Sequence, residues 1–69
     1  MNAEKTGQLI RTLRREKNMT QLQLAEELYL SDKTISKWER GAGCPDISLL
    51  SQLSKLLNVS LETLLGGEL

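Results

Sequence analysis

The feature that most constrains this chain is a pair of short amphipathic segments within residues 20–41, each introduced by a helix-capping residue. Thr20 is a good N-cap, and Gln23 three residues later completes a capping box that satisfies two backbone N–H groups. Ser31 introduces the second segment in the same way, and Asp32 in its first turn complements the helix dipole. The pattern predicts two short helices joined by a tight turn, with the rest of the chain holding them in place.

The two segments differ in how they divide apolar from polar side chains. In the first, Leu24, Ala25 and Leu28 share one face. In the second, Ile35 and Trp38 form only a narrow apolar edge, and their i, i+3 spacing favours a position in the core for the tryptophan side chain. The opposite side carries four polar side chains spaced i, i+3, i+4 and i+7: Lys33, Ser36, Lys37 and Arg40. A helix with a thin buried stripe and a row of donors outside is suited to recognition by a partner.

Apolar periodicity predicts one helix before this pair. Leu9, Ile10 and Leu13 form a helical stripe, so we expect this helix to run from about residue 6 to residue 17. Residues 1–5 are polar, and we expect them to be flexible.

Two further helices are expected after the pair. A loop over residues 41–45 contains two glycines and a proline, which cannot continue a helix. Asp46 or Ser48 then caps a helix whose broad apolar stripe places it mostly in the core. The stripe consists of Ile47, Leu49, Leu50, Leu53, Leu56 and Leu57. Ser60 caps a last short helix over residues 61–65.

The pattern as a whole predicts an all-α fold with five helices, because no stretch shows the alternation of a strand. Asn18 and Asn58 tolerate the left-handed conformation, and each is expected to end the helix before it. A chain of this length supports one domain. We therefore assign residues 6–65 to the domain and residues 66–69, which begin with two glycines, to a tail or linker.

These residues resemble the helix-turn-helix domains of the Cro and lambda-repressor type, also called the XRE type. The likeness covers about residues 6–65 and includes the C-terminal PDISLLSQLSKLLNVSLETLL. Within the motif it rests on Gln21, Ala25, Ser31, Ile35, Trp38 and the S-K-W-E-R-G ending at Gly41. The resemblance implies a five-helix lambda-repressor-like fold with the motif at residues 21–40. It also implies that the helix over residues 32–40 enters the major groove of DNA.

The resemblance also implies an ion pair between two helices, and the chain departs from the family at one position of the turn. In the family, an arginine at the position of Arg14 pairs with a glutamate near the end of the reading helix, here Glu39. The family commonly has glycine or asparagine in the turn between the motif helices, where this chain has Tyr29. A left-handed tyrosine costs about 1–2 kcal/mol, which leaves the geometry of the turn open.

Candidate base contacts lie on the second motif helix. Lys33 and Lys37 can donate to guanine O6 and N7, Ser36 can bond to either type of base, and Asp32 can accept from cytosine N4. The alternative for these positions is an ordinary solvated face, which the surrounding motif outweighs.

Candidate phosphate contacts combine basic side chains with helix starts and the loop after the second motif helix, where backbone N–H groups face outward. They are Arg14, Thr20, Gln21, Ser31, Arg40 and Gly43. For Thr20 and Ser31, a capping role alone is an equal alternative, and both roles can hold at once.

The overall charge is unusual for a nucleic-acid binder, because nine basic residues balance nine acidic ones. The distribution is less even: residues 1–40 carry +2 and residues 41–69 carry −2. The positive bias therefore falls on the half with the reading helix, and we expect non-specific affinity for DNA to be weak.

Several classes of function find little support in the composition. Cys44 is the one cysteine and histidine is absent, so an intrachain disulfide and a Cys/His zinc site are excluded. A serine or cysteine nucleophile would lack its commonest base, so we expect neither an enzyme nor a cofactor. No apolar run has the length of a membrane span, and no signal-peptide core is present, so we expect a cytoplasmic protein.

The sequence therefore predicts sequence-specific binding of double-stranded DNA by a transcriptional regulator, of the repressor type. The resemblance implies a homodimer on a palindromic operator, with a weak contact through the last helices near residues 59–65. The alternative is a protein-interaction module, such as an antitoxin-type domain, that binds a partner through its leucine-rich C-terminal half. The single cysteine, Cys44, is expected to be an inert thiol.

Overall fold

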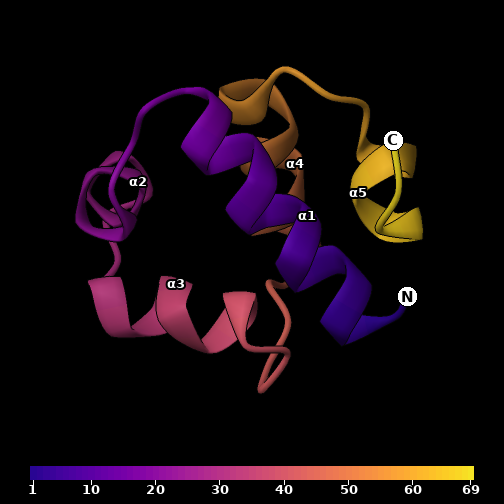
Figure 1. Ribbon diagram of the computed structural model, residues 1–69, viewed down its shortest axis with the longest axis horizontal. Helices are drawn as coiled ribbons and strands as arrows, with labels where there is room; N and C mark the ends of the chain where they lie inside the picture. The colour runs from indigo at the N-terminus through magenta and orange to yellow at the C-terminus, as the bar shows by residue number, and fades with distance from the viewer.

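The computed structural model describes residues 1–69 and contains five helices and no strand. This confirms the predicted all-α fold class. Figure 1 shows α1 crossing the molecule, with α2 and α3 on one side of it and α5 on the other. The helices are α1 (Ala3–Glu16), α2 (Gln21–Glu27), α3 (Asp32–Glu39), α4 (Ile47–Leu57) and α5 (Leu61–Gly66). None of them is long and apolar enough to span a membrane.

Each helix begins at a polar cap whose side chain accepts a backbone N–H group three residues later. Thr20 and Gln23 form the predicted capping box in full. The predicted caps Ser31 and Ser60 are confirmed, and of the two candidates for α4 the cap is Asp46. Four of the five helix starts were therefore predicted from the sequence, because a cap is a local interaction.

The start of α1 was predicted wrongly. Asn2 caps this helix by accepting the backbone N–H of Lys5 at 3.0 Å, so α1 begins at Ala3 rather than at residue 6. Residues 3–5 thus belong to the helix, and the early start places Thr6 inside it. The Thr6 hydroxyl is buried and donates to the carbonyl oxygen of Leu64 at 2.9 Å, which ties α1 to α5.

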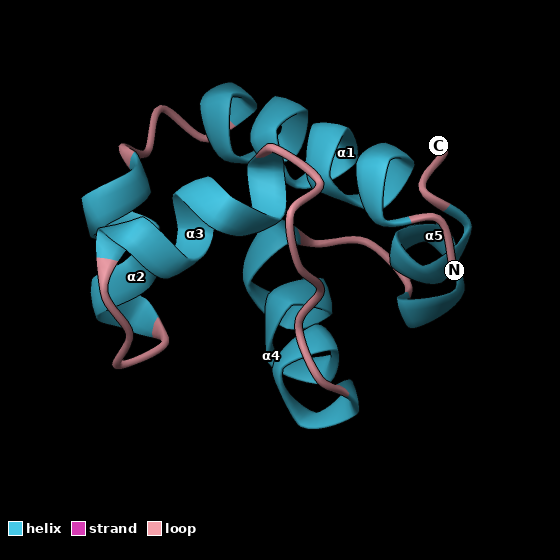
Figure 2. Ribbon diagram, turned by 90° about the horizontal axis from the view of Figure 1, so that it is seen from below, coloured by secondary structure: helices cyan, strands magenta, loops and turns pink.

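The two ends of the chain lie on the same side of the molecule, near α5 (Figures 1 and 2). Gly67 ends α5 in the left-handed conformation, with φ of 71°. The ammonium group of Lys5 then forms an ion pair with Glu68 at 2.8 Å. Residues 67 and 68 therefore lie against the start of α1, and Gly66, which was assigned to the tail, is the last residue of α5.

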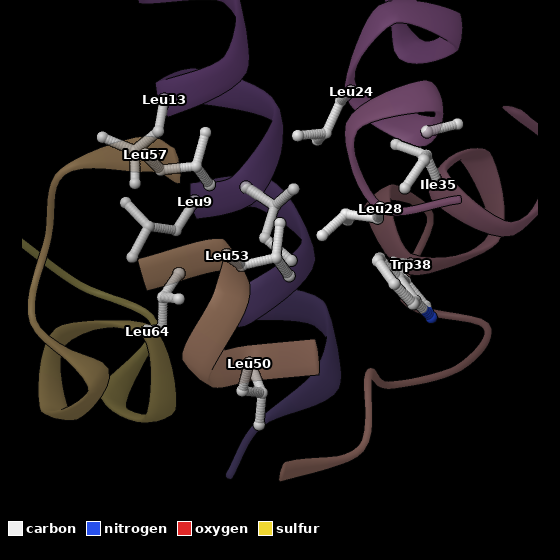
Figure 3. Close-up of a cluster of buried hydrophobic side chains, with 12 residues drawn as sticks. Leu9, Leu13, Leu24, Leu28, Ile35, Trp38, Leu50, Leu53, Leu57 and Leu64 are labelled. Carbon is white, nitrogen blue, oxygen red and sulfur yellow. The ribbon is translucent and has the colours of Figure 1, made fainter. Parts of the chain in front are cut away.

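The core is a single cluster of apolar side chains from all five helices (Figure 3). It consists of Leu9, Ile10, Leu13, Leu24, Ala25, Leu28, Ile35, Trp38, Leu50, Leu53, Leu57 and Leu64. Trp38 is only 5% exposed, which confirms its core position. Ile47 was expected in the core but is 65% exposed. The reason is that the first turn of α4 extends away from the other helices (Figure 2).

Gly7 sets the distance between α1 and α3, and its role was not apparent from the sequence. A Cβ atom at this position would lie 2.0 Å from the carbonyl oxygen of Trp38, so only glycine fits without movement of the backbone. Because Trp38 belongs to α3, this close approach places α3 in direct contact with α1. The sequence marks Gly7 only as a glycine inside a helical pattern.

Three residues other than glycine adopt the left-handed conformation. Asn18 and Asn58, with φ of 57° and 59°, follow the ends of α1 and α4 as predicted. Tyr29 has φ of 59°, so the turn between α2 and α3 keeps its left-handed position even though a tyrosine occupies it. This answers the question that the sequence left open about the turn.

Candidate nucleic-acid interface

The outer face of α3 presents the four candidate base-contacting residues to solvent. The helix is fixed from behind by Ile35 and Trp38, which are both buried. Of the candidates, Asp32, Lys33 and Lys37 are exposed and Ser36 is half-buried. The structure therefore gathers all four on one short, anchored helix.

The loop after α3 folds back along the reading helix. The backbone N–H of Ala42 donates to the carbonyl oxygen of Lys37 at 3.0 Å. A Cβ atom on Gly43 would lie 3.6 Å from the aliphatic carbons of Lys37, so the loop runs beside the stem of that side chain. Gly43 is thus next to a candidate base contact, Lys37.

Arg40 lies at the C-terminal end of α3 and is exposed. Its Nε donates to the hydroxyl oxygen of Ser36 at 3.4 Å, a long hydrogen bond within one helical turn. This contact orients the guanidinium along α3 and leaves its terminal nitrogens available to an acceptor outside the protein.

The two predicted caps that double as phosphate candidates are engaged within the protein. Thr20 accepts the N–H of Gln23 at 3.0 Å, and its own N–H donates to the Gln23 side chain at 2.8 Å. Ser31 accepts the N–H of Thr34 at 3.4 Å. In both residues the capping role is established. The Ser31 hydroxyl also shares a hydrogen bond with the Thr34 hydroxyl at 3.2 Å, whereas the hydroxyl hydrogen of the exposed Thr20 remains for an acceptor such as a phosphate.

Arg14 and Glu39 form a buried ion pair between α1 and α3. The arginine donates through Nε to Oε2 of Glu39 at 2.7 Å and through Nη2 to Oε1 at 2.9 Å, while Nη1 donates to the carbonyl oxygen of Met19 at 2.7 Å. The hydrogen bonds to Glu39 raise the pKa of the Arg14 guanidinium above its ordinary value. The family pairing is confirmed, and Arg14 leaves the set of candidate phosphate contacts because it is buried against Glu39.

Gln21 belongs to the same network, which was not foreseen. Its Nε2 donates to Oε1 of Glu39 at 3.1 Å, and the residue is half-buried. The two residues are 18 positions apart, and nothing in their local sequence announces the contact. The first residue of α2 and the last residue of α3 are therefore joined through one carboxylate.

A hollow on the surface lies away from these residues. It has a volume of about 350 Å³ and is lined by Lys17, Asn18, Met19, Gln23, Glu26 and Glu27. None of the candidate DNA-contacting residues borders it, and its charges are mixed. The candidate interface is thus a convex helix face with its flanking loop rather than a pocket.

A protein-family model described as Helix-turn-helix matches residues 10–64, which is most of the chain and includes α2, α3 and α4. The chain belongs to the Cro/C1-type (XRE) helix-turn-helix family. The residues that carried the resemblance lie in this XRE domain at the expected places, since Ala25, Ile35 and Trp38 are buried and Ser31 caps α3.

Named regulators share this XRE domain. The transcriptional activator BcrR of Enterococcus faecalis is 49% identical over 59 residues, which are 86% of this chain and 29% of BcrR. The regulator ImmR of Bacillus subtilis is 37% identical over 62 residues, 90% of this chain and 49% of ImmR. The immunity repressor of Bacillus phage phi105 is 34% identical over 62 residues, 90% of this chain and 43% of the repressor. The chain thus spans less than half the length of these relatives.

A solved structure supports the same fold for the XRE domain. The crystal structure of the clp gene regulator ClgR from C. glutamicum superimposes with a TM-score of 0.82 at 28% sequence identity. The match covers 97% of this chain and 87% of that one. The likeness therefore extends through all five helices rather than being limited to the motif.

Proposed function

We propose that this chain is the sequence-specific, double-stranded-DNA-binding domain of a transcriptional regulator, with α3 in the major groove. The observation that carries the proposal is the outer face of α3, where four polar side chains stand opposite a buried edge. An α-helix with its side chains is about 10–12 Å wide, which matches the major groove of about 12 Å. Family membership and relatives named as transcriptional regulators support the same function.

Within this function the base contacts fall to the exposed end and middle of α3. Lys33 and Lys37 donate to guanine, Ser36 bonds to either type of base, and Asp32 accepts from cytosine. The phosphate contacts hold the helix in register on the duplex. We assign them to Thr20, Gln21, Ser31, Arg40 and Gly43.

The regulatory role, the oligomeric state and the cellular location are also part of this proposal. Relatives are named both as a repressor and as an activator, and we retain a repressor-like role as the proposal. We also propose a weak homodimer on a palindromic operator, supported by Leu61 and Leu65 of α5, which are only partly buried. A cytoplasmic location rests on the proposed function. The comparisons give no support to an antitoxin-type interaction module.

The first test is selection of preferred sites from a random duplex library at about 0.1 M salt, where screening suppresses non-specific phosphate binding. We expect an enriched palindromic motif whose half-sites are about one helical turn apart. Absence of any enriched sequence would contradict specific recognition by this chain.

The second test uses variants on the enriched duplex. Lys33→Ala and Lys37→Ala should each weaken binding at least about tenfold and relax the base preference at one position of the half-site. Lys55→Ala is the matched control, because Lys55 is an exposed lysine on α4 away from the α3 face. An equal loss in the control would show that the α3 lysines act only through overall charge.

A further inference from the structure

Glu39 is a buried charged residue that base reading does not use. It is the last residue of α3, and its carboxylate accepts three hydrogen bonds. Two come from the guanidinium of Arg14, at 2.7 and 2.9 Å, and the third comes from the side-chain amide of Gln21 at 3.1 Å. Arg14 alone would compensate the negative charge of the Glu39 carboxylate, so the hydrogen bond from Gln21 is not needed to neutralise it.

We propose that Glu39 is a positioning residue for DNA binding: its carboxylate holds the amide of Gln21 so that one amide N–H stays within the protein and the other is presented to a DNA phosphate. This inference rests on the function proposed above and specifies how one phosphate contact is made. Glu39 itself does not touch DNA.

The chemistry of the amide supports this role. A glutamine side chain carries two N–H donors on one nitrogen, and the carboxylate of Glu39 takes one of them. Gln21 is half-buried rather than enclosed, and its Nε2 makes no hydrogen bond within the protein other than the one to Glu39. A long, unanchored side chain must be ordered when it binds, and that ordering opposes binding. Because Glu39 orders Gln21 beforehand, the contact to a phosphate forms without that loss.

A second candidate phosphate contact, Arg40, adjoins the residue that Gln21 contacts. Gln21 donates to Glu39, and Arg40 is the next residue in the chain and is exposed. One candidate donor at the start of α2 and one at the C-terminal end of α3 are therefore both next to Glu39. Donors so placed can hold one segment of the DNA backbone.

Arg14 makes this arrangement compatible with an anion. A bare carboxylate beside the contact would repel a phosphate, but the two hydrogen bonds from Arg14 compensate the charge of Glu39. Arg14 also donates to the carbonyl oxygen of Met19, which fixes the chain just before α2. The arginine thus serves DNA binding without contacting DNA.

The test compares phosphate-by-phosphate maps of binding. Ethylation interference on the enriched duplex reports which phosphates the unaltered chain needs. Gln21→Met keeps the length of the side chain and removes its donors, so we expect affinity to fall about tenfold and sensitivity to one phosphate per half-site to disappear. Glu39→Met keeps the length of the side chain and removes both acceptor oxygens, so it should erase the same phosphate while the other phosphates and the base preference persist. Gln21→Met combined with Glu39→Met should bind no more weakly than Gln21→Met alone.

A second variant keeps the test decisive if Glu39→Met, which leaves Arg14 without its partner, unfolds. Arg14→Met with Glu39→Met replaces the ion pair with apolar side chains, a change that folded proteins often tolerate. In this double variant Gln21 is intact but has lost its acceptor, so the same phosphate should again disappear from the map. Gln52→Met, an exposed glutamine on α4, is the matched control and should leave the map unchanged.

Two results would overturn the inference. If the Glu39 variants weaken binding evenly and keep every phosphate of the map, Glu39 supports only the fold, and the proposed function stands. If the unaltered chain enriches no duplex at all, the inference falls together with the proposed function.

Discussion

Tyr29 shows what a single residue can reveal about the motif. Its backbone is left-handed and its side chain is 95% exposed, so no packing offsets the strain. The turn nevertheless closes, because the N–H of Tyr29 donates to Glu26 at 3.2 Å and the N–H of Leu30 donates to Ala25 at 2.9 Å. The geometry of the turn is therefore set by the two helices, and the residue within it bears the cost.

Replacing Tyr29 should consequently stabilise the protein. Tyr29→Gly removes a conformational penalty of about 1–2 kcal/mol and adds chain entropy to the unfolded state, so we expect a net gain of up to about 1 kcal/mol. Thermal denaturation followed by circular dichroism measures the gain. Tyr29→Ala keeps the strain and removes only the ring, so its melting temperature should stay near that of the unaltered chain. A clear loss in the alanine variant would show that the ring packs against something.

Gly7 presents the opposite case, a residue fixed by close contact. In Gly7→Ala the new Cβ would meet the carbonyl oxygen of Trp38 at 2.0 Å, and backbone cannot move aside cheaply. We expect a loss of about 3 kcal/mol in the free energy of unfolding, measured by urea denaturation. Gly66→Ala is the matched control, because nothing lies within 4 Å of that position and alanine favours the helix. Equal stability of the two variants would mean that α1 and α3 can separate without cost.

At the scale of the helices, the sequence predicted what is local and missed what joins distant segments. Thr20, Ser31 and Ser60 were recognised as caps because each acts within three residues of itself. The contact of Gln21 with Glu39 was not foreseen, since it depends on how α2 and α3 pack. For Arg14, the family resemblance predicted the partner, Glu39. The burial that removes Arg14 from the phosphate candidates depends on packing and was not predicted.

The cap of α4 gives this helix a measurable pH dependence. The backbone N–H of Leu49, followed by the hydroxyl of Ser48, lowers the pKa of the Asp46 carboxyl below its ordinary value of 3.8. The unfolded chain therefore binds the proton more readily than the folded one. The stabilisation is present above pH 3.8 and is lost as the pH falls through the lower pKa of the folded state.

Asp46→Asn should remove this dependence while keeping the cap, because asparagine caps helices about as well. Melting temperatures of both chains between pH 2 and about pH 6 provide the measurement, since the acid range of the carboxyl lies within it. We expect similar values at the upper end and a greater fall for the unaltered chain below pH 3.8. The other carboxyl groups titrate in both chains and cancel in the difference. Parallel curves throughout would contradict a pKa lowered by the cap.

For the whole molecule, one core unites the reading helix with the rest of the fold. In Figure 3, Leu24, Leu28 and Ile35 of the motif helices lie on one side of the cluster, and Leu57 and Leu64 lie on the other. The position of α3 therefore depends on the packing of the complete cluster. These 69 residues form one core cluster, so no second core would keep α3 in place if this cluster were disrupted.

A deletion at the centre of this cluster should consequently unfold the entire molecule. Leu53 is fully buried, and Leu53→Ala costs about 2–5 kcal/mol. A single core in a domain of this size rarely supplies more than about 3–5 kcal/mol in total. We expect the variant to be largely unfolded without denaturant, so that the emission typical of a buried Trp38 and the helical circular dichroism are both lost, whereas the unaltered chain should lose the two signals in one coincident urea transition. Leu22→Ala, at a side chain that is 53% exposed, should change stability by about 0.5 kcal/mol or less. If fluorescence were lost while much of the helical signal remained, the motif helices and the C-terminal helices would be separate folding units.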